Sequence, residues 1–248
     1  MRRRLASPRV VLLVALTCAL WGAFCAQASA YLITFQVNGT LDAFGGPPLA
    51  PLAIGQPYSS TFVFESKAAS TPVFGGGNDF IGAVRSATFS IGSYSGTLVD
   101  PTATTIRVLD NFFGNSDSYV VFLGDTMFGT PGVIDAPPVT GPLGGLNPVL
   151  FRLVSLDDFF PSLDGLSNTD LPLTPPDITK FDSARWVVEF RSADLSLFGT
   201  AGGTIQSLRV AEVPEPPSLV VFLIGLVGLG LARYRWMPRR PRATLIRG

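Results

Sequence analysis

Between residues 31 and 213 apolar and polar side chains alternate with a period of two, and this alternation limits the fold more than any other feature. Ile33, Phe35 and Val37 form one such series, and Trp186 and Phe190 lie in another. Successive side chains of a β-strand point to opposite faces, so each series gives a strand with one apolar face. No stretch of this region shows a convincing helical stripe of apolar residues. The pattern predicts antiparallel sheets.

Turn-forming residues separate nine of these runs, which we expect to be strands. They are residues 31–40, 59–65, 83–91, 94–99, 104–109, 119–123, 151–155, 185–190 and 204–210. Three long segments rich in Pro, Gly and Asp, at 44–57, 130–148 and 157–177, are expected to be loops without strands. The predicted fold class is all-β: an antiparallel β-sandwich of eight or nine strands, of jelly-roll or Greek-key type.

Composition excludes several classes of function. The chain contains no histidine, which rules out His-ligated zinc and any Ser-His or Cys-His nucleophile pair. Residues 31–213 hold eight basic and seventeen acidic residues, which argues against nucleic-acid binding. Both cysteines, Cys18 and Cys25, lie near the N-terminus, so an exported domain beginning after them would fold without disulfides.

The N-terminus has the pattern of a secretory signal peptide over residues 1–30. Arginines follow Met1, residues 10–24 are apolar, and Ala28 and Ala30 form an A-x-A cleavage site before Tyr31. A retained membrane anchor is the alternative, and the small residues at the site favour cleavage. The remainder of the chain is then exported across the inner membrane by the secretion machinery, and the domain is residues 31–213.

A second apolar run covers residues 219–232, where a helix would extend about 21 Å, short of the hydrocarbon core of about 30 Å. Flanking residues allow this helix to span a membrane marginally, with residues 243–248 as a cytoplasmic tail. An extended segment, Pro214-Glu215-Pro216, precedes the run. The basic cluster that follows it is expected at the cytoplasmic end, and consists of Arg233, Arg235, Arg239 and Arg240.

This order of Pro-Glu-Pro, short apolar span and arginine cluster, over residues 214–242, resembles the PEP-CTERM sorting signal of exopolysaccharide-producing bacteria. The resemblance implies that exosortase, a membrane-embedded enzyme, is a partner and processes the tail at the motif. It also implies delivery to the cell envelope, cell surface or extracellular matrix, with the membrane contacted through the C-terminal helix before processing. An ordinary single-pass tail anchor behind a proline-rich linker is the alternative.

Oxygen-bearing side chains suggest one weak metal site. Asp110, Asn111, Asn115 and Asp117 surround a turn and could bind calcium. A second set of acids lies at positions 157, 158, 164 and 170. Neither set has EF-hand spacing, and Asp and Asn are also the preferred turn residues, so we favour turns and expect no cofactor.

Few residues of the predicted domain are candidates for catalysis. Glu189 and Arg191 share one strand face, which we interpret as an ion pair rather than a catalytic acid, because a glycosidase needs two facing carboxylates. Phenylalanine pairs at 112–113 and 159–160 could stack on sugars or pack at loop ends. Together with what the PEP-CTERM resemblance implies, we expect a non-enzymatic, structural or adhesive protein within exopolysaccharide. The alternatives are a carbohydrate- or calcium-binding lectin-like module and a carboxylate hydrolase.

Overall fold

A computed structural model describes residues 31–112, 116–124, 132–141, 144–158, 165–194 and 196–211. The predicted signal helix at 1–30 and the predicted transmembrane helix near the C-terminus lie outside these residues. In the described part of the chain, no helix has both the length and the apolar character needed to cross a membrane.

The predicted all-β, antiparallel class is confirmed, and each of the nine expected runs lies in a strand to within one residue at its ends. Two short 3-10 helices, η1 (Pro101–Ala103) and η2 (Ile178–Lys180), interrupt the strands. The strands are β1 (Leu32–Gly45), β2 (Pro57–Glu65), β3 (Thr71–Pro72), β4 (Gly77–Ile81), β5 (Val84–Ile91), β6 (Tyr94–Leu98), β7 (Thr104–Phe112), β8 (Ser116–Leu123), β9 (Ile134–Asp135), β10 (Val139–Gly141), β11 (Gly144–Asp157), β12 (Ser183–Arg191) and β13 (Phe198–Val210).

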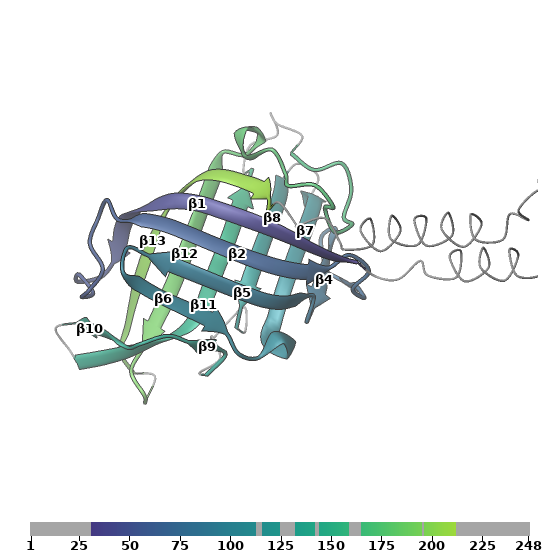
Figure 1. Ribbon diagram of the computed structural model, residues 1–248. Coiled ribbons are helices and arrows are strands. Elements are labelled where there is room, and N and C mark those ends of the chain that lie inside the picture. The colour runs from purple at the N-terminus through teal and green to yellow at the C-terminus, as the bar shows by residue number, and fades with distance from the viewer. Residues whose placement is uncertain are drawn as a thin grey trace, which may run out of the picture. The chain divides into compact units, whose positions relative to one another are not determined.

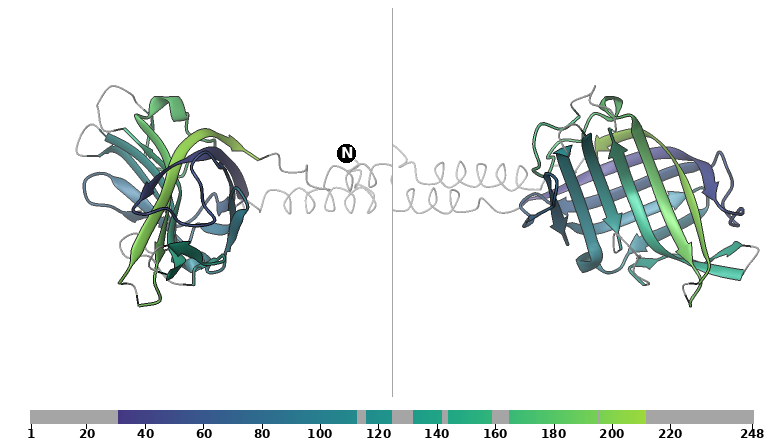
Figure 2. Two further views of the ribbon diagram at one scale, coloured as in Figure 1. Left: turned by 90° about the vertical axis from the view of Figure 1, so that its left-hand side faces the viewer. Right: turned by 180° about the vertical axis from the view of Figure 1, so that it is seen from behind.

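Hydrogen bonds join the strands into one continuous ladder in the order β3-β4-β7-β8-β11-β12-β13-β1-β2-β5-β6-β9, with β10 paired to β11. The sheet folds over on itself. In Figure 1, β1, β2, β5 and β6 lie in front of β7, β8, β11 and β12 and cross them at a steep angle. Figure 2 shows the same two layers from the side and from behind.

An aromatic core fills the space between the two halves. The alternation in β1 buries Phe35, which packs edge-on against Phe64 with ring centroids 5.0 Å apart. From the other half, Trp186 of β12 stacks on Tyr58 of β2 at 4.3 Å. The Trp186 indole N–H also donates to the Thr40 carbonyl oxygen at 3.3 Å. Burying such large rings from both halves is the main stabilising contribution to this fold.

The sequence underestimated the number of strands, and two of the expected loops contain strands. The segment 130–148 includes β9, β10 and the beginning of β11, and 44–57 includes the last residues of β1. The short strand β4, which lies between the edge strand β3 and β7, was also missed. Its residues Gly77 and Asn78 are turn formers by composition, but β4 pairs with β7 through its backbone, which needs no apolar alternation.

Candidate functional site

The residues predicted to direct processing lie outside the described part of the chain, so they stay predictions. They are Ala28, Ala30, Pro214, Glu215, Pro216, Arg233, Arg235, Arg239 and Arg240. The structure does describe the residues nearest to both predicted cleavage points. Tyr31 exchanges hydrogen bonds with Ser66, and the Ala211 N–H donates to the Thr34 carbonyl oxygen at 2.9 Å. The start of β1 and the end of β13 are therefore neighbours.

The predicted calcium ligands fall at the turn between β7 and β8. Asp110 and Asn111 are near the end of β7, Asp117 is in β8, and Asn115 is outside the described residues. Asn111 has a left-handed backbone with φ of 54°, which asparagine tolerates better than most residues. Its side-chain amide donates to Asp110 Oδ1 at 2.9 Å. These contacts are those of a turn.

Asp117 is a buried anchor for three backbone amides. Its Oδ1 accepts from the Asn111 N–H, and its Oδ2 accepts from the N–H groups of Gly165 and Leu166, each at 2.9 Å. Its side chain joins the β7–β8 turn to a segment 48 residues further along the chain. Among the described residues, no group of three or more His, Cys, Asp or Glu side chains is placed to hold a metal ion.

A pocket of about 350 Å³ adjoins Asp117 and is also lined by Phe112, Asp157 and Asp158. Asp157 accepts hydrogen bonds from the hydroxyls of Ser118 at 2.7 Å and Ser155 at 2.8 Å. Asp117 and Asp157 thus hold neighbouring strands and turns together through their hydrogen bonds.

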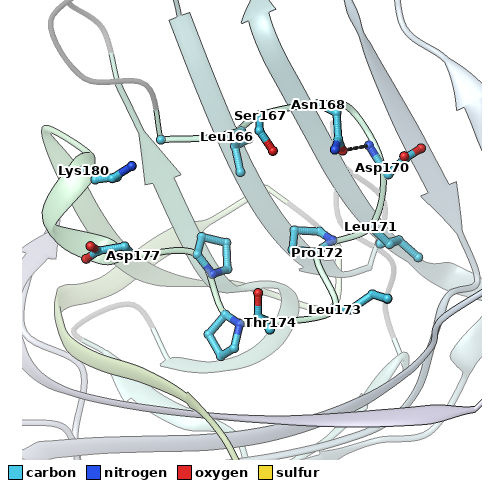
Figure 3. A pocket seen from close by; sticks show the side chains of 13 residues that line it. Leu166, Ser167, Asn168, Asp170, Leu171, Pro172, Leu173, Thr174, Asp177 and Lys180 are labelled. Carbon is cyan, nitrogen blue, oxygen red and sulfur yellow. Dashed lines mark hydrogen bonds between the residues drawn. The ribbon is translucent and has the colours of Figure 1, made fainter.

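A larger open hollow, of about 490 Å³, lies within the segment from Gly165 to Lys180 (Figure 3). Its wall combines polar groups such as Asn168 and Asp170 with the rings of several prolines. Asn78 of β4 secures the segment by donating to the Thr169 carbonyl oxygen at 3.1 Å. The composition of this segment predicted a loop and gave no signal for the hollow.

Two local turns shape this segment. The Asn168 side chain accepts from the Asp170 N–H at 2.8 Å. Asp177 accepts from both the N–H and the hydroxyl of Thr179 at the start of η2, and these bonds lower the pKa of Asp177. Mixed polar and apolar lining of this kind can bind a small polar ligand.

Glu189 forms the ion pair expected from the sequence, and a second arginine joins it. Arg191 Nη2 is 4.0 Å from Glu189 Oε2, and Arg152 Nη2 of β11 is 3.9 Å from Glu189 Oε1. Arg152 was not predicted, because only the register of β11 against β12 brings it there. Of the four phenylalanines considered as sugar platforms, Phe112 lines the acidic pocket, and those at 113, 159 and 160 are outside the described residues.

Comparison of the chain with protein-family models, with curated proteins and with solved structures finds no match.

Proposed function

We propose that this chain is an exported protein of the bacterial envelope, cell surface or extracellular matrix. In this proposal a PEP-CTERM-type signal sorts it and exosortase processes the signal. The exported domain has no catalytic role and acts as a structural or adhesive component within exopolysaccharide.

The observation that carries the proposal is the order of three features at the C-terminus. Pro214-Glu215-Pro216 is followed by the apolar run 219–232 and then by the arginine cluster. Each feature is common alone. Together, in a chain that carries a secretory signal pattern before its domain, they describe a final segment that directs sorting.

The geometry of the domain ends supports this organisation. Ala211, three residues before Pro214, is still hydrogen-bonded to Thr34, and Tyr31 directly follows the predicted signal cleavage site. Both predicted cleavage points therefore flank the paired strands, and neither falls inside one. Loss of residues 1–30 and of the C-terminal tail would leave every described strand intact.

The test is the intact mass of the protein recovered from its native host. A chain that starts at Tyr31 and ends near 214–217 is the expected result. Replacing Pro214, Glu215 and Pro216 by alanine should leave the tail in place, whereas the matched control Ser218→Ala should be processed normally. A wild-type chain that extends to Gly248 would overturn the sorting proposal.

A second candidate is a lectin-like module that binds carbohydrate or calcium, and the hollow of about 490 Å³ favours it. A rise in melting temperature with millimolar Ca²⁺ would support calcium dependence, and no rise would count against it. The finer description of the domain as a jelly-roll or Greek-key sandwich also belongs to the proposal. It is supported by the two sheet halves that face each other across one aromatic core.

A further inference from the structure

Two arginines of the described domain share a single carboxylate. Arg152 and Arg191 both approach Glu189. The other four described arginines each have an acceptor of their own. These four pairs are Arg85 with Glu65, Arg107 with Asp79, Arg185 with Asp42, and Arg209 with the amide oxygen of Gln36. Arg152, Glu189 and Arg191, here called the arginine pair cluster, therefore carry a net charge of +1 on a domain that is otherwise acidic.

Glu189 holds the two arginines only loosely. The separations of 3.9 and 4.0 Å exceed hydrogen-bond length, so Glu189 offsets one of the two positive charges without accepting a close N–H. The Nε atoms of Arg152 and Arg191 are buried and have no hydrogen-bond partner within the described structure. By contrast, Arg107 forms two bonds of 2.7 Å with Asp79. Because the two Nε atoms are buried, a ligand would bind to the exposed parts of these side chains, where a charged acceptor forms a strong hydrogen bond.

The cluster lies on the outer face of the sheet half formed by β7, β8, β11, β12 and β13, the face turned toward the viewer in the right-hand view of Figure 2. Strand alternation places Arg152 and Glu189 opposite the core residues Phe151 and Val188. The arginine side chains remain accessible, with 40% of Arg152 and 25% of Arg191 exposed. Both arginine side chains are therefore partly open to a ligand.

Aromatic rings lie on both sides of the cluster. The Arg152 guanidinium is 5.8 Å from the centroid of the Phe122 ring, which belongs to a small buried apolar group on this face. This contact holds the guanidinium in place. At the other side, Phe198 of β13 lies directly opposite Arg191 in the ladder and is 67% exposed. From β8 to β13 the face extends over three strand spacings, or about 14 Å.

We propose that this face binds a carboxylate-bearing polysaccharide, such as a polymer of uronic acids. The planar guanidinium fork of an arginine matches a carboxylate, and the position of Glu189 shows that a carboxylate fits between the two arginines. The exposed ring of Phe198 supplies an apolar surface for the face of a sugar. The inference rests on the proposed function, because a matrix location brings the domain into contact with such polymers.

The experiment measures the affinity of the full chain, kept in solution with a non-ionic detergent and EDTA, for three polymers. Polygalacturonate carries carboxylates, dextran is neutral, and dextran sulfate carries sulfates. We expect binding to polygalacturonate and little binding to dextran. Arg152→Gln and Arg191→Gln should each weaken binding about tenfold, equivalent to about 1.4 kcal/mol. Arg85→Gln is the matched control, because it removes the same charge from β5 in the other half of the sheet and should leave the affinity unchanged.

Glu189→Gln distinguishes a binding role from a structural one. Removing the carboxylate that competes with the ligand should strengthen binding to polygalacturonate about threefold and steepen its dependence on salt. If the cluster only stabilised the fold, this variant would behave like the arginine variants. Near-ultraviolet circular dichroism and melting of every variant establish that the fold is retained.

Four results would overturn the inference. The first two are no binding to polygalacturonate and binding to dextran as tight as to polygalacturonate. The others are binding to dextran sulfate that is equally tight and equally dependent on the two arginines, and weaker binding of polygalacturonate by the Glu189→Gln variant. The proposed function fails separately. If polygalacturonate does not bind but the secreted chain is correctly processed, only the glycan site is wrong. If polygalacturonate binds and the chain extends to Gly248, only the sorting proposal is wrong.

Discussion

Replacing Asp117 by asparagine tests whether this buried carboxylate anchors the backbone or binds a metal ion. The substitution keeps the size of the side chain but leaves one oxygen in place of two. If that oxygen keeps the Gly165 and Leu166 amides, the new NH₂ group must face the Asn111 N–H. One bond is then lost, two donors oppose each other, and the two remaining bonds lose their charge assistance.

The expected loss is about 3 kcal/mol, because bonds to a charged acceptor contribute about 1.5–3 kcal/mol each and neutral bonds about 1 kcal/mol. For a domain of this size such a loss lowers the melting temperature by roughly 6–12 °C. Denaturant unfolding and thermal melting of the full chain in detergent measure both quantities. Asp135→Asn, an exposed position in β9, is the matched control and should change stability by less than about 0.5 kcal/mol.

Measuring stability with and without calcium distinguishes a backbone anchor from a metal ligand at Asp117. A backbone anchor predicts the same loss in EDTA and in millimolar Ca²⁺. The reasoning is refuted if Asp117→Asn is as stable as wild type. It is equally refuted if Ca²⁺ stabilises the wild type and the substitution abolishes that gain, because Asp117 would then be a metal ligand.

Three further predictions concern the core and the joint between β1 and β13. Gly203→Ala would place a Cβ 1.7 Å from the Thr40 carbonyl oxygen and should lower the free energy of unfolding by about 3 kcal/mol or more. The control Gly145→Ala has open space around its Cβ and should be nearly neutral. Equal effects of the two substitutions would contradict this packing. Trp186→Ala should cost about 3–5 kcal/mol, and a loss below 1 kcal/mol would show that the stacked pair is not central. Burial raises the pKa of three tyrosines, so they should stay protonated in the native state above pH 10. The unfolded chain then releases protons that the folded chain keeps, and stability should fall as pH rises past about 10. The three tyrosines are Tyr58, Tyr94 and Tyr119. In an ultraviolet titration their phenolate absorbance should appear only when the protein unfolds. Gradual ionisation of the folded protein would contradict this prediction.

The sequence by itself determined the strands whose side chains form the core. Over residues 33–41 of β1, 58–64 of β2 and 186–190 of β12 every second residue is buried, which follows the alternation visible in the sequence. Glu189 and Arg191 are two residues apart on one strand, so their shared face was also predictable. In these cases the residues that interact are close in sequence or lie in a simple periodic pattern.

Only the tertiary structure decided the contacts between distant segments. The strands β4, β9 and β10 pair through backbone groups that every residue carries, so composition gave no signal for them. Asp117 finds its partners in the amides of a loop, and Arg152 meets Glu189 through the register of two strands. The first and last strands lie side by side although they stand at opposite ends of the domain sequence. Side-chain alternation encodes which face of a strand is buried, but it does not encode which strand comes next to it.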